Sequence, residues 1–134
     1  AELSGRFRID RKPLYSEALH VNTSYLTAVA NDYSYDEVFS RLVEAKCSTC
    51  DVLVSISTSG RSVNVLKAIE MAKSIGVVNV GLTGKNGGQM SGICDYLIRI
   101  PSDETSHIQE SHIMVGHIIC GIVEESLFLE QNGK

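Results

Sequence analysis

Residues 51–75, DVLVSISTSGRSVNVLKAIEMAKSI, decide the fold of this chain. Residues 51–56 are a β-branched run with no charge after the first position, which predicts a strand buried on both faces, as in a parallel sheet. A turn rich in hydroxyl groups follows at 57–62, and residues 64–75 then predict a helix that ends at Gly76. A strand, a turn and a helix in this order are typical of a parallel α/β sheet.

The flanking segments continue the alternation of strands and helices. Further strands are predicted at 17–22, 77–82 and 95–100. Helices are predicted at the remaining amphipathic or apolar stretches, which are 23–30, 36–45, 89–93 and about 104–129. The sequence therefore predicts one domain over residues 1–134, a three-layer α/β/α sandwich with a mostly parallel sheet.

Composition excludes several classes of protein. Apolar residues make up 43% of the 134 residues and charged residues 21%, which is typical of a globular chain and not of a disordered one. A formal charge of −4 disfavours non-specific binding to nucleic acid. No continuous apolar run is long enough to predict a membrane span, and the first eleven residues do not resemble a signal peptide, so we expect a cytoplasmic protein.

The cysteines include one pair at the spacing of redox and zinc motifs. Cys47 and Cys50 form a Cys-x-x-Cys, whereas Cys94 and Cys120 stand alone. A structural zinc site needs a second ligand pair, which does not follow closely, and a redox motif usually opens a helix, whereas here a strand follows. We interpret the pair as two free thiols in a loop, which fits a reducing compartment.

The turn after the central strand carries the strongest functional signal. Five hydroxyl side chains fall within eight residues: Ser55, Ser57, Thr58, Ser59 and Ser62. Ligands of parallel α/β sheets bind at the carboxyl ends of the strands, and the unpaired amides of a helix N-terminus attract anions. The alternative is a serine-rich helix cap, although a cap needs only one or two hydroxyls. We predict a phosphate site, and since no lysine follows Gly60, a phosphosugar suits it better than a nucleotide.

Polar residues interrupt the last predicted helix. His107, Gln109, His112 and His117 lie within eleven residues of one another. Gln109 and His117 are about 80° apart around a helix and about 12 Å apart along it, so both could reach one ligand. Histidine suits proton transfer near neutral pH, but a single histidine in such a helix is more often an ordinary core or surface residue.

Weaker signals lie elsewhere. Glu2 and Arg6 are four residues apart, on one face of a predicted helix, where the alternative is a surface salt bridge. Asp32 follows an apolar helix and could equally belong to a plain turn. Residues 83–88, TGKNGG, could form a second phosphate loop, although a glycine-rich turn explains them better.

Several stretches together resemble one family. AELSGRF, ANDYSYDEVFSRLVEA, DVLVSISTSGRSVNVLKAIEMAK, VGLTGKNGG and IRIPSDETSHIQESHIMVGHIIC are similar to the sugar isomerase (SIS) domains, and most of all to those of phosphoheptose isomerases. The resemblance covers residues 1 to about 128 and implies an SIS, flavodoxin-like fold. It also implies conversion of sedoheptulose 7-phosphate to D-glycero-D-manno-heptose 7-phosphate through an enediol, the first step of bacterial heptose synthesis, which can supply lipopolysaccharide.

The resemblance also assigns residues. It implies Glu2 and His117 as the acid/base pair, and Arg6, Asp32 and Gln109 as contacts to the sugar. It implies that four hydroxyl residues bind the phosphate: Ser57, Thr58, Ser59 and Ser62. The family can carry a zinc ion held by a glutamate, a glutamine and two histidines, and Glu2, Gln109 and His117 would be three of those ligands. No nucleotide cofactor is implied, and the family assembles as homotetramers.

Departures from the family pattern leave alternatives open. Family members have a strand, a Gly-Asn-Gly-Gly-Ser loop and a histidine before the glutamate that corresponds to Glu2, so we expect this chain to lack its natural N-terminus. His107 stands where the family commonly has arginine. A non-catalytic relative that binds the replication initiator, or a sugar-phosphate sensor, is the alternative function. Glu2 and His117 favour the isomerase, because the initiator-binding branch lacks the corresponding residues.

Overall fold

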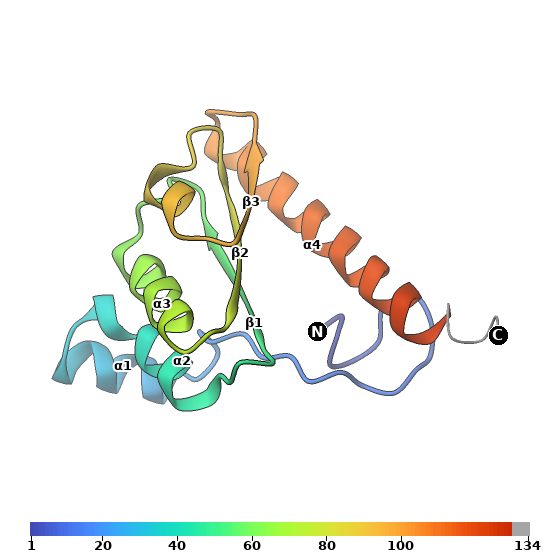
Figure 1. Cartoon of the computed structure of the whole chain (residues 1–134), viewed down its shortest axis with the longest axis horizontal. Helices are drawn as coiled ribbons and strands as arrows, with labels where there is room; N and C mark the ends of the chain where they lie inside the picture. Colours follow the sequence, from blue (N-terminus) through green and yellow to red (C-terminus); the bar gives the residue numbers. More distant parts are fainter. Residues whose placement is uncertain (130–134) are drawn as a thin grey trace. The chain divides into compact units, whose positions relative to one another are not determined.

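A computed structural model describes residues 1–129 of the chain (Figure 1). The chain forms two compact units, one of residues 19–109 and one of residues 1–18 together with those from 110 onward. Each unit is described by itself. The prediction of one domain over 1–134 stays a prediction, and residues 130–134 lie outside the described part.

The unit of residues 19–109 is built on a parallel sheet. Its strands follow the order of the sequence: β1 (Val52–Ser57), β2 (Val78–Gly84) and β3 (Tyr96–Ile100). Val80 of β2 lies opposite Val54 on one side and Tyr96 on the other. The α/β class and the predicted strands at 51–56, 77–82 and 95–100 are therefore confirmed.

Three helices of this unit precede β1 in the chain, and two more connect its strands. They are α1 (Thr23–Asp32), η1 (Tyr35–Glu37), α2 (Ser40–Lys46), α3 (Val63–Ser74) and η2 (Gly88–Gly92). The Asn22 side chain caps the start of α1 by accepting a hydrogen bond from the Tyr25 amide at 3.0 Å. The predicted helix 36–45 is divided into η1 and α2, because Glu37 pairs with Lys67 of α3 and accepts from the Ser40 hydroxyl.

The predicted strand at 17–22 is wrong, since this segment has no regular structure and pairs with no described strand. Only Leu19 of this segment packs against the core, while its neighbours are exposed. A short apolar-leaning stretch with a single buried side chain gives no face to bury and no reason for strand pairing.

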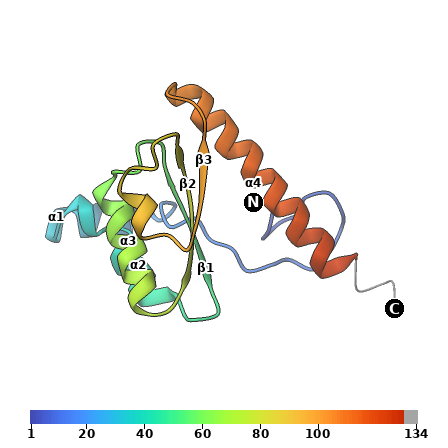
Figure 2. The same cartoon turned by 45° about the horizontal axis from the view of Figure 1, so that its top comes forward.

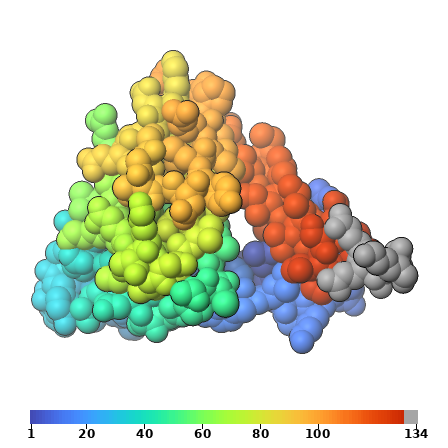
Figure 3. All heavy atoms as spheres, in the orientation of Figure 1, coloured from blue at the N-terminus to red at the C-terminus, as the bar shows by residue number. Residues whose placement is uncertain are grey.

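Helix α3 lies between α2 and the sheet and forms the core with them (Figure 2). Ala68 and Ala72 of α3 pack against Val43 of α2, and Leu53 of β1 joins this cluster. In a second cluster Ile69 of α3 packs against Met90 of η2, and Leu97 of β3 joins them. In the space-filling view the segments of α2 and α3 form one continuous surface (Figure 3).

The opposite face of the sheet departs from the sequence prediction. We expected β1 to be buried on both faces, but Val54 and Ile56 are 46% and 53% exposed. The side chains that alternate with them, Ser55 and Ser57, are buried. Helix α3 packs on the face of Ser55 and Ser57 (Figures 1 and 2), so the helices of this unit leave the β-branched side chains of the other face exposed.

The second unit consists mainly of helix α4 (Thr105–Phe128), which begins in the first unit, and of the segment 1–18. By length and composition alone α4 could cross a membrane, which the sequence did not lead us to expect. The helix nevertheless carries Glu110, His117 and Glu124, and Glu124 pairs with Arg11 of its own unit. Polar contacts of this kind are typical of a helix packed in protein.

The predicted helix around Glu2 and Arg6 is wrong, because residues 2–4 form a single turn. The Gly5 amide donates to the Ala1 carbonyl at 2.7 Å, but the helix does not continue. The carbonyls that would accept the next helical bonds take distant donors, since Leu3 O accepts from the Leu14 amide and the Arg11 guanidinium.

We predict that Ile69→Ala lowers the free energy of unfolding by about 3 kcal/mol, because it leaves a cavity beneath α3. Ile69 is completely buried, whereas Val63, in the first turn of the same helix, is 47% exposed. Val63→Ala is the control and should cost less than about 1 kcal/mol. Urea denaturation measures both values, and equal losses would contradict this description of the core.

Candidate functional site

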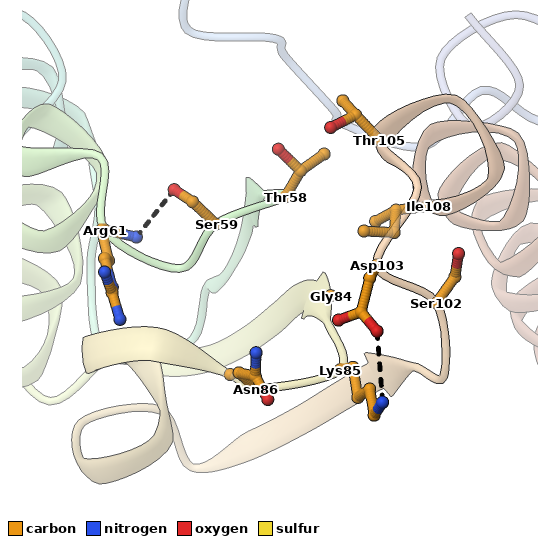
Figure 4. A pocket seen from close by; sticks show the side chains of 11 residues that line it. Thr58, Ser59, Arg61, Gly84, Lys85, Asn86, Ser102, Asp103, Thr105 and Ile108 are labelled. Carbon is orange, nitrogen blue, oxygen red and sulfur yellow. Dashed lines mark hydrogen bonds and ion pairs between the residues drawn. The ribbon is translucent and has the colours of Figure 1, made fainter.

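Three loops meet at the carboxyl ends of the three strands and enclose a pocket of about 320 Å³ (Figure 4). The loops are 58–62 after β1, 85–87 after β2 and 101–104 after β3. Parallel pairing sets all three strand ends along one edge of the sheet, which is where open α/β sheets bind ligands. The residues that line the pocket are Thr58, Ser59, Arg61, Gly84, Lys85, Asn86, Gly87, Ser102, Asp103, Thr105 and Ile108.

Backbone hydrogen bonds hold the first two loops together. The Gly84 amide donates to the Thr58 carbonyl at 3.0 Å, and the Gln89 amide donates to the Gly60 carbonyl at 2.9 Å. Within the first loop, the Gly60 amide donates to the Ser57 carbonyl at 3.1 Å. The pocket floor is therefore a fixed piece of backbone rather than two independent turns.

This close approach requires glycine at Gly60 and Gly88. Both have positive φ, at 62° and 54°. A Cβ atom on Gly60 would lie 2.2 Å from the Gly87 carbonyl oxygen, and one on Gly88 would lie 2.5 Å from the Ser59 carbonyl oxygen. Any side chain at either position would push the loops apart, so these glycines set the shape of the pocket.

The predicted phosphate hydroxyls divide into two pairs. Thr58 and Ser59 line the pocket, and the Ser59 hydroxyl accepts a hydrogen bond from the Arg61 amide at 3.2 Å. Ser57 and Ser62 instead bond to each other, with their oxygens 3.0 Å apart. Ser62 is the N-cap residue of α3 but makes no capping bond with its side chain, so the excess of hydroxyls is not explained by capping.

Two cations line the same pocket, and the sequence analysis missed both. Arg61 comes from the first loop and Lys85 from the second, where Lys85 pairs with Asp103 at 3.2 Å (Figure 4). This ion pair is exposed, so water screens it and the lysine remains available to an anionic ligand. The signal was a lysine inside the glycine-rich segment 83–88, which we interpreted as a turn.

Hydroxyls, loop amides and cations together suit a phosphate group. Thr58 faces Thr105 and Ile108 at the start of α4 across the pocket (Figure 4). Neutral donors and a helix start can hold phosphate oxygens, while Arg61 and Lys85 balance the charge. Asp103 is the one carboxylate in the pocket lining, so the two cations Arg61 and Lys85 outnumber it and the lining keeps a net positive charge.

Two other predicted residues of this unit lie outside the pocket lining. Asp32 is the last residue of α1, is exposed, and accepts a hydrogen bond from the Asn31 side chain at 3.0 Å. Gln109 is exposed on α4, one residue after Ile108, which does line the pocket.

The predicted acid/base residues belong to the second unit. Glu2 is half-buried in the N-terminal turn, Arg6 is exposed, and His117 lies on α4. The ring of Phe7 stacks on His117 with centroids 5.8 Å apart. Burial raises the pKa of the Cys120 thiol, and the negative charge of Glu2 raises it further, so Glu2 lies within electrostatic reach of Cys120 on α4.

All four cysteines are free thiols. Cys47 ends α2 and Cys50 lies in the following turn, as predicted for thiols in a loop, and burial raises the pKa of Cys47. Within residues 1–129, no group of three or more histidine, cysteine, aspartate or glutamate side chains lies close enough to hold a metal ion.

Comparisons with known proteins agree with this geometry. A family model for the SIS domain matches residues 1–84. Phosphoheptose isomerase of Rhodospirillum rubrum is 56% identical over 127 residues, which are 95% of this chain and 68% of the relative. Phosphoheptose isomerase of Aneurinibacillus thermoaerophilus is 53% identical over 127 residues, covering 95% of this chain and 64% of the relative.

Solved structures show the same similarity. A phosphoheptose isomerase from Francisella tularensis matches with a TM-score of 0.89 and 35% identity over 92% of this chain and 66% of its own. One from Neisseria gonorrhoeae matches with a TM-score of 0.78 and 42% identity over 80% of this chain and 61% of its own. The chain thus spans about two thirds of the length of these relatives.

We predict that Gly60→Ala weakens binding of inorganic phosphate at least tenfold and lowers the melting temperature. The positive φ alone costs about 1–3 kcal/mol for a residue with a side chain. Gly92→Ala is the control, because Gly92 has open space around it and no positive φ. Calorimetric titration with phosphate measures the effect, and wild-type affinity in Gly60→Ala would show that the interlocked loops do not shape the site.

Proposed function

Because this chain belongs to the phosphoheptose isomerase family of SIS-domain proteins, we propose that it converts sedoheptulose 7-phosphate to D-glycero-D-manno-heptose 7-phosphate. The observation that carries the proposal is the pocket at the three strand ends, whose hydroxyls, amides and cations suit a phosphate group. An aldose–ketose isomerase needs such a site to hold its substrate by the end that does not react.

The phosphate of the sugar would occupy this pocket. Thr58 and Ser59 would donate their hydroxyl protons to its oxygens, and Arg61 and Lys85 would balance its charge. Ser57 and Ser62 would hold the loop from behind through their mutual hydrogen bond. Their role in this proposal differs from direct contact, which the family resemblance implies for all four hydroxyls.

The chemistry requires a base and an acid. The base removes a proton from C1 of the open-chain ketose while the acid protonates the C2 oxygen, which gives an enediol. The proton is then returned to C2, and the O1 hydroxyl loses its proton to form the aldehyde. A carboxylate and an imidazole suit these transfers, and we assign them to Glu2 and His117 as a pair without dividing the steps between them.

The remaining assignments are proposals of the same kind. Arg6, Asp32 and Gln109 would contact the hydroxyls of the sugar. Exposed apolar side chains on α4 support a homotetramer, since they leave a face that a second copy could cover: Ile113, Met114, Ile118 and Ile122. We also propose a cytoplasmic enzyme of carbohydrate metabolism whose product feeds lipopolysaccharide synthesis, without nucleic-acid or membrane partners.

A non-catalytic role, as initiator-binding protein or sugar-phosphate sensor, is not favoured. The relatives with 50–56% identity are named phosphoheptose isomerases. The chain also has Glu2 and His117, which a protein that only binds the phosphosugar would not need.

We predict that Glu2→Gln and His117→Gln each lower turnover of sedoheptulose 7-phosphate at least about 100-fold, since each removes a proton-transfer group. Binding of the sugar phosphate should change less than threefold, because the phosphate pocket is untouched. Glu44→Gln and His20→Gln are the controls, since both residues are exposed and lie outside the proposed machinery. The assay uses the protein in its natural full-length form, and near-normal turnover in either variant would contradict the assignment.

Zinc is a separate proposal. The carboxylate of Glu2, the amide oxygen of Gln109 and the imidazole of His117 are donors that zinc accepts. Of these three donors, only Glu2 and His117 are among the histidine, cysteine, aspartate and glutamate residues that commonly bind metals. Within residues 1–129, no three side chains of those four types lie close enough together to hold a metal ion.

Metal analysis tests the zinc proposal directly. For protein purified without chelator, we expect close to one zinc per chain in the wild type and less than a tenth of that in His117→Gln, since a three-donor site tolerates no loss of imidazole. Inductively coupled plasma mass spectrometry gives the occupancy. Absence of zinc, with no change of turnover when zinc is added, would overturn the proposal.

A further inference from the structure

Within the second unit the N-terminal segment runs beside α4 (Figure 1), and a buried ion pair joins the two. The Nε atom of Arg11 lies 2.9 Å from Oε2 of Glu124, and both side chains are 2% exposed. We propose that Arg11 and Glu124 are positioning residues that hold Glu2 against α4 in the orientation that proton transfer requires. This inference rests on the proposed function and deepens it.

The Glu124 carboxylate accepts hydrogen bonds from three residues of the N-terminal segment. Its Oε1 atom accepts from the backbone amides of Arg8 at 3.0 Å and Ile9 at 3.3 Å, while Oε2 accepts from Arg11. Burial acts to raise the pKa of Glu124, but the hydrogen bonds from Arg8, Arg11 and Ile9 outweigh it and hold the pKa below the ordinary value. The carboxylate therefore stays ionised and paired at neutral pH.

Arg11 also binds the backbone of Glu2, one of the two proposed proton-transfer residues. Its Nη2 atom donates to the Glu2 carbonyl at 2.7 Å, and its Nη1 atom donates to the Leu3 carbonyl at 2.9 Å. The planar guanidinium thus joins the Glu124 carboxylate to the backbone of Glu2 in one rigid fork. The same bonds occupy the carbonyls of Glu2 and Leu3, so the helical turn at residues 2–4 does not continue. The guanidinium thereby fixes the backbone of Glu2, from which its side chain extends.

The contacts follow one face of α4. Five residues of α4 lie at positions i, i+3, i+4, i+7 and i+11, which places them on one side of the helix: His117, Cys120, Gly121, Glu124 and Phe128. Phe7 stacks on His117, the Glu2 charge acts on Cys120, and the Arg11 guanidinium lies 5.5 Å from the centre of the Phe128 ring. Gly121 leaves room, since a Cβ atom there would lie 3.3 Å from the Arg8 guanidinium.

This arrangement places both proton-transfer residues on a common support. His117 stands on the contact face itself, and Glu2 is held against it by the fork that ends at Glu124, two turns further along α4. A shift of about 1 Å in a reacting group can lower a rate about 100-fold without changing how substrate is held. Loss of the fork should therefore lower kcat and leave KM almost unchanged, because the phosphate pocket belongs to the other unit.

The test compares two neighbouring glutamates. Glu124→Gln weakens the buried pair, whereas Glu125→Gln removes the exposed pair between Glu125 and Arg8, so the chemical change is the same at adjacent positions. In the full-length enzyme we expect Glu124→Gln and Arg11→Gln to lower kcat about 30- to 100-fold with KM within twofold of wild type. Glu125→Gln should leave both constants unchanged.

A double variant separates positioning from stability. Arg11→Gln alone leaves a buried carboxylate without its cation and could unfold the unit, whereas Arg11→Met/Glu124→Gln removes both charges and keeps a side-chain oxygen that accepts from the amides of Arg8 and Ile9. We expect the double variant to keep a melting temperature within a few degrees of wild type and to have a kcat at least about 30-fold lower. Wild-type kcat in this variant, or a loss confined to KM, would overturn the positioning role.

Glu2→Gln, assayed in parallel, distinguishes the two levels of the proposal. If wild type is active, Glu2→Gln is inactive and the double variant is fully active, the positioning role fails and the proposed function stands. If Glu2→Gln is active, the acid/base assignment fails and the positioning role fails with it. If wild type does not isomerise the sugar phosphate, the proposed function itself is wrong.

Discussion

The backbone of the first two loops can form a phosphate site only because Gly60 and Gly88 pass each other without side chains. Both have positive φ, and an added Cβ atom would lie only 2.2 Å (Gly60) or 2.5 Å (Gly88) from a carbonyl oxygen of the other loop, so no residue with a side chain fits. Parallel pairing of β1 with β2 brings the two loops to the same edge, and the bonds from Gly84 to Thr58 and from Gln89 to Gly60 then lock them. The positions of Thr58, Ser59, Arg61 and Lys85 all follow from this contact.

Local patterns predicted what depends on local packing. The β-branched runs predicted the three strands, because side chains that alternate along a strand must find a face to bury. The strand at 17–22 failed since Leu19 alone reaches the core. The hydroxyl-rich turn was visible in the sequence, but the division between pocket-facing and mutually bonded hydroxyls depends on loop geometry.

The N-terminal turn shows why spacing alone could not predict the rest. Glu2 and Arg6 have helical spacing, yet the carbonyls of Glu2 and Leu3 are taken by Arg11, whose own position is set by a carboxylate 113 residues away. A sequence pattern records which residues can meet within one helix, and it contains no information on a contact across almost the whole chain. Lys85 was missed for a related reason, because its neighbour Asp103 arrives from the next strand.

The pair of Arg11 and Glu124 also explains the composition of α4. By length and composition α4 could cross a membrane, yet it has a buried carboxylate at Glu124. Burial of this charge would destabilise the fold unless a cation and further hydrogen-bond donors paired with it. Arg11 and the amides of Arg8 and Ile9 supply these partners, so the polar residues on one face of α4 are matched by the segment that carries Glu2. The apolar side chains of Ile118 and Ile122 are exposed in the described residues. An exposed apolar face of this kind is available to pack against a second chain.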